Sequence, residues 1–327
     1  MSAMPERTVP GTDLTVSALG FGAWATGGLW WGDDVDDRSS TDAIRAAVAG
    51  GVTLFDTAPL YGHGHADAVL ARALGGDRQR VILATKVGVT FGGEPQTGSD
   101  HARSDLRPHL LRPDVEASLR RLRTDTIDLL QIHWPCESGT PLEDTLGELH
   151  RLRDEGLVRH IGLCNDDLPA VERALEVGPL ATLQIPLSLV RREAERTLLP
   201  GCSERDVGVI AYEALCRGLL SGRFGARPPS FPQTDLRARD PRFAGSGFQR
   251  AAAFTQRIQA AAERLRVPTS ALALAWVARR LGVTCTLFGA KTAAQVEQNL
   301  QAARILRNAK PATWRVIDTI ADTFTGW

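Results

Sequence analysis

The segment Thr53–Asp67, TLFDTAPLYGHGHAD, is the most informative part of the chain for its architecture. A short apolar run ends there in the carboxylate of Asp56, and five residues later Tyr61, one of only two tyrosines in the chain, opens a glycine-rich turn. An apolar run this short suits a strand that is buried on both faces, as in a parallel sheet. The segment therefore predicts a buried strand with polar side chains beyond its carboxyl end.

Seven further apolar runs have the same character, because they are bounded by turn residues and are too short for helices. These runs are SALGFGAW (17–24), VILATK (81–86), TIDLLQIH (126–133), VRHIGLCN (158–165), TLQI (182–185), GVIAY (208–212) and TCTLFG (284–289). Helical periodicity appears between them, at residues 42–48, 114–123, 143–153, 168–176, 191–199, 251–265, 269–280, 292–306 and 312–324. Pro113 is expected to open the second of these helices, since proline is favoured in a first helical turn.

Strand and helix alternate about eight times, which predicts an α/β protein with a (β/α)8 TIM barrel. We expect a parallel eight-stranded barrel with outer helices and extra C-terminal helices, forming a single domain over residues 1–327. A doubly wound sheet that binds a dinucleotide would normally carry G-x-G-x-x-G after an early strand, and the sequence has no such match. The long irregular segment Arg223–Gly247 is expected to be either functional or disordered, and whether it closes over a ligand is left open.

The composition limits the partners and the compartment. The chain has 38 basic and 38 acidic residues, which argues against nucleic acid or an anionic membrane as the main partner. The uncharged run Leu14–Gly32 is long enough to raise the question of a membrane span, but its five glycines favour a strand and a loop. The N-terminal residues lack the apolar core of a secretory signal, and the five cysteines form no C-x-x-C pair, so a cytoplasmic location is expected.

Ionisable side chains close three of the predicted strands, at Asp56, Lys86 and His133. The carboxyl ends of all strands in a parallel barrel open on one face, where polar residues indicate site chemistry. Lys86 is one of only three lysines in the chain, so it occupies a position where arginine was not used. A plain ion pair between Asp56 and Lys86 at the barrel rim is the alternative for each residue taken singly.

Together with Tyr61, these residues suit proton transfer to or from a carbonyl or alcohol oxygen. Tyrosine has an ordinary pKa of about 10, and burial raises it. An ammonium ~4 Å from the phenol contributes up to ~4 kcal/mol at an effective dielectric constant of about 20, so Lys86 is expected to outweigh partial burial. Asp56 would keep Lys86 charged, and His133 would polarise a substrate oxygen or share its proton. Such a set suits hydride transfer from a cofactor.

Seven spaced motifs extend this pattern over nearly the whole chain. They are FDTAPLYGHG (55–64), ATKVG (84–88), QIHWP (131–135), IGLCN (161–165), LQIPLSLVRRE (183–193), IAYEALCRGLLSGRF (210–224) and FGAKTAAQVEQNL (288–300). In this order they resemble the aldo-keto reductase family, and WATGGLWWGDD (24–34) is similar to the bacterial branch with general-stress and inositol-associated reductases. The resemblance implies a barrel that binds NADPH without a Rossmann domain, with the catalytic tetrad Asp56, Tyr61, Lys86 and His133 and with Tyr61 as general acid.

The same resemblance implies where the cofactor lies. The nicotinamide carboxamide would lie near Cys164, Asn165 and Gln184. The pyrophosphate would lie along Leu215 to Leu219 and the adenosine along Gly289 to Asn299, with Lys291 as a candidate for the 2′-phosphate. A solvated position in a first helical turn is the alternative for Lys291. The expected cofactor-binding residues are Trp24, Asp56, Cys164, Asn165, Gln184, Tyr212, Leu215, Arg217, Gly218, Gly289, Lys291, Gln295, Gln298 and Asn299.

Three departures from the family pattern bear on the cofactor. Cys164 replaces the usual serine beside Asn165, and Gln298 stands where many members have glutamate facing the adenine. Leu187 is assigned to the position where the family commonly stacks a tyrosine on the nicotinamide, so either the stacking is lost or Tyr212 supplies it. These departures put cofactor affinity and the preference for NADPH over NADH in doubt.

Aromatic and histidine side chains suggest two further roles. Trp24, Trp31 and Trp134 follow barrel-top motifs and are expected to line the substrate pocket, although packing is an equal alternative for any one of them. His63 and His65 have H-x-H spacing, but no third ligand is evident nearby, so no metal is expected.

The expected function is NADPH-dependent reduction of aldehydes or ketones to alcohols, with a small-molecule carbonyl as the substrate. We expect a monomer or weak homo-oligomer that binds neither nucleic acid nor membrane. One alternative is an NAD(P)+-dependent sugar or aldose dehydrogenase. Another is a cofactor-sensing regulatory subunit with little turnover.

Overall fold

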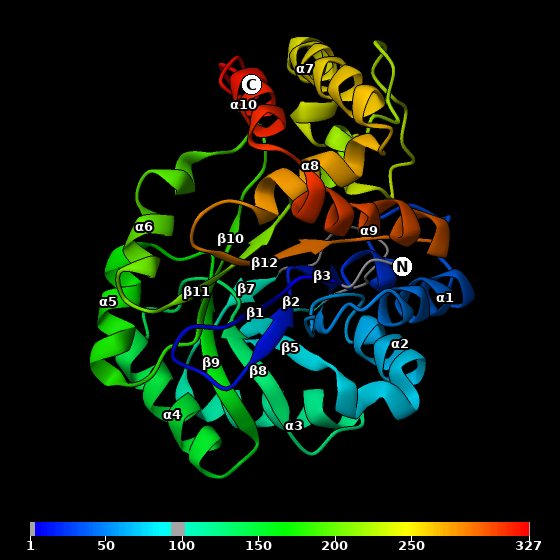
Figure 1. The fold of residues 1–327 in the computed structure, drawn as a ribbon. Coiled ribbons are helices and arrows are strands. Elements are labelled where there is room, and N and C mark those ends of the chain that lie inside the picture. The colour runs from blue at the N-terminus through cyan, green and yellow to red at the C-terminus, as the bar shows by residue number, and fades with distance from the viewer. Residues whose placement is uncertain (1–3, 93–101, 327) are drawn as a thin grey trace.

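The computed structural model describes residues 4–92 and 102–326, and its centre is a closed parallel barrel (Figure 1). The strands follow one another around the ring in chain order. They are β3 Leu19–Gly22, β4 Leu54–Asp56, β5 Ile82–Val87, β8 Ile127–Ile132, β9 Val158–Cys164, β10 Thr182–Pro186, β11 Gly208–Tyr212 and β12 Val283–Phe288. Each of them overlaps one of the eight apolar runs, so the predicted (β/α)8 barrel is confirmed.

Helices surround the barrel, and α7 and α10 lie outside the others, beyond α8 (Figure 1). They are α1 Asp37–Ala49, α2 His65–Leu74, α3 Pro108–Leu122, α4 Leu142–Asp154, α5 Leu168–Val177, α6 Leu198–Ser203, α7 Gly245–Leu265, α8 Thr269–Ala278, α9 Ala293–Asn308 and α10 Pro311–Ala321. Short 3-10 helices are η1 Ala25–Gly27, η2 Gly75–Arg80, η4 Glu193–Glu195, η5 Cys216–Ser221, η6 Leu236–Ala238 and η7 Pro241–Phe243. Within the described ranges, each helix is too short or too polar to cross a membrane.

Two helix predictions were wrong in detail. Pro113 lies inside α3, and Pro108 takes the place at the first turn that was predicted for Pro113. The helix expected over 191–199 is broken, because Thr197 has a non-helical backbone with φ −132° and ψ −51° between η4 and the start of α6. Local periodicity does not register such a break, since the apolar spacing continues across it.

The core has two parts, one between the strands and the helices and a smaller one inside the barrel. The antiparallel hairpin of β1 Glu6–Thr8 and β2 Thr15–Ser17 joins the inner part through residues such as Leu14. Arg7 donates a hydrogen bond to the carbonyl of Val283, the first residue of β12, over 2.7 Å. The hairpin therefore covers the end of the barrel where the strands begin, and the opposite end is left for a site. A second short hairpin pairs β6 Val89–Thr90 with β7 Arg103–Ser104.

Candidate active site

The carboxyl ends of β4, β5 and β8 bring the four residues of the predicted tetrad together. Lys86 Nζ donates to Asp56 Oδ1 over 2.5 Å, and to the carbonyl of Thr57 over 3.0 Å. It lies 3.3 Å from the hydroxyl of Tyr61. The ring of His133 meets the ring of Tyr61 edge-on, with centroids 6.0 Å apart. Asp56, Lys86 and His133 are all buried. The ammonium of Lys86 is therefore paired with the carboxylate of Asp56 away from bulk water.

The turn after β4 requires glycine at position 62. Gly62 has φ +62°, and a Cβ there would lie 2.3 Å from the carbonyl oxygen of Gly27. This backbone contact joins the turn that carries Tyr61 to the loop that carries Trp24, whose ring stacks near Tyr61 with centroids 6.0 Å apart. Glycine at position 62 therefore allows the two loops to pack closely, so that the Trp24 ring lies beside the phenol of Tyr61.

Burial dominates the acidity of Tyr61. It raises the pKa of Tyr61 to about 12, against the opposing charge of Lys86. The expectation that Lys86 would outweigh burial was wrong, because Asp56 lies against the same ammonium and offsets its field at the phenol. Burial also opposes the charge of Lys86, but Asp56 more than compensates and raises the pKa of Lys86 above its ordinary value.

His133 is a neutral imidazole at neutral pH. Burial, and then the charge of Lys86, lower the pKa of His133 well below its usual value. A neutral imidazole carries one N–H donor and one acceptor nitrogen. His133 is therefore suited to donate a hydrogen bond and does not act as a cation.

A cavity of about 1000 Å³ opens above the tetrad, which is at the upper end of the usual range for small-molecule and cofactor sites. Every residue predicted for catalysis, cofactor binding or the substrate pocket lies on its wall. They are Trp24, Trp31, Asp56, Tyr61, Lys86, His133, Trp134, Cys164, Asn165, Gln184, Tyr212, Leu215, Arg217, Gly218, Gly289, Lys291, Gln295, Gln298 and Asn299. Their placement agrees with one shared site, while their individual roles stay predictions.

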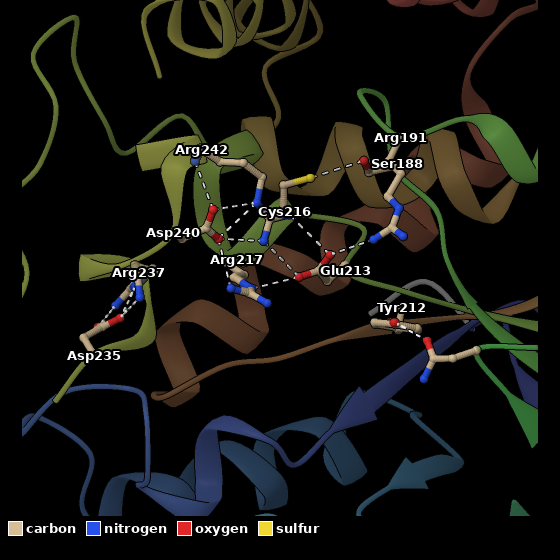
Figure 2. Close-up of polar contacts among 11 residues, drawn as sticks. Ser188, Arg191, Tyr212, Glu213, Cys216, Arg217, Asp235, Arg237, Asp240 and Arg242 are labelled. Carbon is tan, nitrogen blue, oxygen red and sulfur yellow. Dashed lines mark hydrogen bonds and ion pairs between the residues drawn. The ribbon is translucent and has the colours of Figure 1, made fainter. Parts of the chain in front are cut away.

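The two residues weighed for ring stacking lie in different environments. Leu187 is fully buried in the outer core. Tyr212, at the end of β11, lies on the cavity wall, and its hydroxyl donates to Asn165 Oδ1 over 2.5 Å (Figure 2). The structure therefore favours Tyr212 as the residue whose ring faces a ligand, and Leu187 lies away from the cavity. Cys164, beside Asn165, keeps its proton, because burial raises the pKa of its thiol to about 12.

An ion-pair network that the motifs did not predict ties the loop after η5 to the cavity wall (Figure 2). Arg217 pairs with Glu213 and with Asp240, each over 2.9 Å, and Arg242 pairs with Asp240 over 2.7 Å. Arg223, Arg237 and Arg242, all from the segment 223–247, line the cavity. The length and Arg/Asp-rich composition of that segment were the only sequence signals for this contribution.

Lys291 does not lie free in solvent. Its Nζ donates to the carbonyl of Trp31 over 2.5 Å and to Asp34 Oδ1 over 2.6 Å. The segment that contains Trp31 and Asp34 also contacts the segment 223–247, because the backbones of Trp31 and Asp235 form an antiparallel β-bridge. Three segments that are distant in sequence therefore meet at the end of the cavity next to α9.

His63 and His65 point to different partners. His65 Nε2 contacts Asp37 Oδ1 over 2.7 Å, and the ring of His63 stacks on Phe91 with centroids 4.6 Å apart. In the described part of the chain, no three His, Cys, Asp or Glu side chains form a cluster that could hold a metal ion.

The fold and a match to a family model define the class of protein. The model of the aldo/keto reductase family matches residues 18–321, and the chain belongs to this family. The protein is therefore an oxidoreductase of carbonyl compounds that uses a nicotinamide cofactor.

Individual relatives cover most of the chain. "Aldo-keto reductase YhdN" of Bacillus subtilis (strain 168) is 36% identical over 301 residues, which are 90% of this chain and 87% of that protein. "NADH-specific methylglyoxal reductase" of Escherichia coli (strain K12) is 31% identical over 310 residues, with 92% and 94% covered. The solved structure of the glycerol dehydrogenase AKR11B4 from Gluconobacter oxydans has a TM-score of 0.87 and 35% identity, over 99% of this chain and 97% of that one.

Proposed function

We propose that the protein reduces small aldehydes or ketones to alcohols with NADPH, and that Tyr61 is the proton donor. The observation that carries this proposal is the contact of 3.3 Å between Lys86 Nζ and the Tyr61 hydroxyl, at the floor of a large cavity. An ammonium at a phenol oxygen stabilises the phenolate that remains after proton transfer, which is the property a tyrosine acid needs.

The cavity fits a nicotinamide dinucleotide. It extends from the tetrad, past the amides of Asn165 and Gln184, to the amino end of α9, where backbone N–H groups and the helix dipole favour an anion. Gly218 has φ +91° on the cavity wall, and a Cβ there would meet no other atom within 4 Å, so the backbone can be approached closely at that point. A bound reduced nicotinamide supplies a hydride to the carbonyl carbon.

The residues of the chain supply the proton and its stabilisation. A phenol with a pKa of about 12 is protonated at neutral pH, so Tyr61 is ready to act as an acid. Lys86 then stabilises the phenolate, and Asp56 holds Lys86 charged and in place. His133, which is neutral, donates a hydrogen bond to the substrate oxygen and so shares in polarising the carbonyl.

The preference for NADPH is proposed from Lys291. Its ammonium lies one residue before the N-cap of α9, where a 2′-phosphate would find both a positive charge and a helix amino end. Asp34 is paired with this ammonium in the protein, so its negative charge would oppose a phosphate at the same place. We therefore propose only a moderate preference for NADPH, and the relative described as NADH-specific supports treating the preference as tunable.

The same site run in reverse would oxidise an alcohol. The structural relative described as a glycerol dehydrogenase supports this second candidate, a polyol or sugar dehydrogenase. Oxidation needs the phenolate form of Tyr61, so with a pKa of about 12 this direction should be favoured only at alkaline pH.

The test is NADPH consumption by the purified protein with a panel of aldehydes, ketones and sugars, beside the Tyr61→Phe variant. Loss of at least two orders of magnitude in kcat, with the Kd for NADPH unchanged, supports Tyr61 as the general acid. Tight binding of NADPH without turnover on any substrate would replace the proposal with the cofactor-sensing alternative. Absence of binding to both NADPH and NADH would refute it.

A further inference from the structure

Gln131 lies under the tetrad and has no part in the roles assigned so far. It belongs to β8, two residues after Leu129, which is in the inner core, so its side chain also points into the barrel. The side chain is 0% exposed. A buried amide needs hydrogen-bond partners, and those of Gln131 connect two functional residues.

Asp56 receives hydrogen bonds on both carboxylate oxygens. Oδ1 faces Lys86, while Oδ2 accepts from Gln184 Nε2 over 2.8 Å and from Gln131 Nε2 over 3.1 Å. Gln184 Nε2 also donates to Gln131 Oε1 over 3.2 Å. Asp56, Gln131 and Gln184 therefore form a closed triangle on the side of Asp56 away from Lys86.

The carboxylate of Asp56 sets the direction of both amides. An ionised carboxylate only accepts hydrogen bonds, so each glutamine must turn its NH2 group toward it. Gln131 Oε1 accepts from the same Gln184 nitrogen, so both of that nitrogen's protons have acceptors. The carbonyl oxygen of Gln184 is left pointing away from Asp56, where it accepts a hydrogen bond from Cys164 Sγ over 3.7 Å in the cavity wall. An amide oxygen has two lone pairs, so it can also accept from a ligand.

We infer that Gln131 is a positioning residue that couples the tetrad to the cofactor site. It holds Asp56 beside Lys86, and it locks the amide of Gln184 with its carbonyl oxygen as the acceptor presented to the ligand. The inference rests on the proposed function, in which a nicotinamide dinucleotide occupies the cavity that passes this amide. The Gln184 oxygen then accepts a hydrogen bond from the nicotinamide carboxamide. Among the described residues of the cavity wall Gln131 does not appear, so it acts through Asp56 and Gln184 and not by contact with a ligand.

The experiment compares cofactor affinity in variants of similar side-chain length. Gln131→Met keeps the length and removes both hydrogen bonds, and the expected result is a Kd for NADPH about three- to tenfold higher by fluorescence titration. Leu129→Met, a volume-conserving change two residues away inside the same barrel, is the control and should leave the Kd unchanged. Thermal melts show whether each variant is folded.

A double-mutant cycle separates positioning from a general structural role. If Gln131 acts through Gln184, adding Gln131→Met to Gln184→Met changes the Kd by less than about twofold, because the locked amide is already absent. If Gln131→Met does not fold, Gln131→Asn serves instead, since its shorter amide cannot reach both partners. The inference is overturned if the folded Gln131 variant binds NADPH with the same Kd as wild type. It is also overturned if the Gln131 change raises the Kd by the same factor in wild type and in Gln184→Met.

The wild-type protein distinguishes this failure from failure of the proposed function. Absence of NADPH and NADH binding by wild type refutes the proposed function itself. Wild type that binds NADPH and reduces carbonyls, with Gln131 variants that bind equally well, removes only the positioning role.

Discussion

Asp34→Asn should strengthen binding of NADPH and leave binding of NADH unchanged. Asp34 Oδ1 lies 2.6 Å from Lys291 Nζ, and the hydrogen bond from Lys291 lowers the pKa of Asp34, so this carboxylate is ionised at neutral pH. A 2′-phosphate that pairs with Lys291 would lie close to this carboxylate, and the two negative charges would repel each other. Asparagine has nearly the same shape but no charge, so the variant removes this repulsion with little change in packing.

The magnitude follows from the exposure of the pair. The side chain of Asp34 is 75% exposed and that of Lys291 is 14% exposed. Ion pairs with one partner in water are worth about 0.2–1 kcal/mol. Since 1.4 kcal/mol corresponds to a factor of ten, the Kd for NADPH should fall up to about fivefold. The difference between variant and wild type should shrink at ~1 M salt, where the Debye length is about 3 Å.

The assay is a fluorescence titration of wild type and variant with NADPH and NADH at fixed ionic strength. Asp33→Asn is the matched control, because it removes the same charge at the neighbouring position. The carboxylate of Asp33 accepts a hydrogen bond from Thr234 Oγ1 over 2.9 Å and not from Lys291. Equal changes for the two cofactors, or equal changes in the two variants, would refute the assignment of Lys291 to the 2′-phosphate.

Three further outcomes follow from the site. Lys86→Met should lower kcat by at least about a hundredfold. It should also lower the melting temperature, because Asp56 is left buried without its cation. Unchanged activity would contradict the role of Lys86. For reduction, kcat/KM should be flat between about pH 6 and 9, since a raised pKa of about 12 keeps Tyr61 protonated throughout, whereas alcohol oxidation should rise with pH; a fall in reduction near neutrality would contradict this. Gly62→Ala should destabilise the fold by about 1–3 kcal/mol in chemical denaturation, because Gly62 has a positive φ and lies against the carbonyl of Gly27. Gly76→Ala, at a position with open space, should leave the free energy of unfolding unchanged. Similar effects of both changes would show that the turn after Tyr61 is not constrained.

The barrel could be predicted because its signals are local. A strand buried on both faces must be apolar along its length, and each of the eight strands carries such a run. The positions of Asp56, Lys86 and His133 at strand ends followed from the same pattern, since parallel strands bring their carboxyl ends to one face. The helix over 191–199 failed because the backbone at Thr197 leaves the helical region, which apolar spacing does not record.

The remainder depended on contacts between distant parts of the chain. Lys291 and Asp34 are 257 positions apart, and the triangle of Asp56, Gln131 and Gln184 joins three different strands. The acidity of Tyr61 was misjudged from sequence because it is set by how deeply the ring is buried and by how closely Asp56 offsets Lys86. The order of residues was sufficient for strands, helices and the side on which the site lies, because these depend on local pattern. Desolvation and charge pairing depend on distances in space, so only the folded barrel could determine the pKa values, the orientation of the amides and the partner of Lys291.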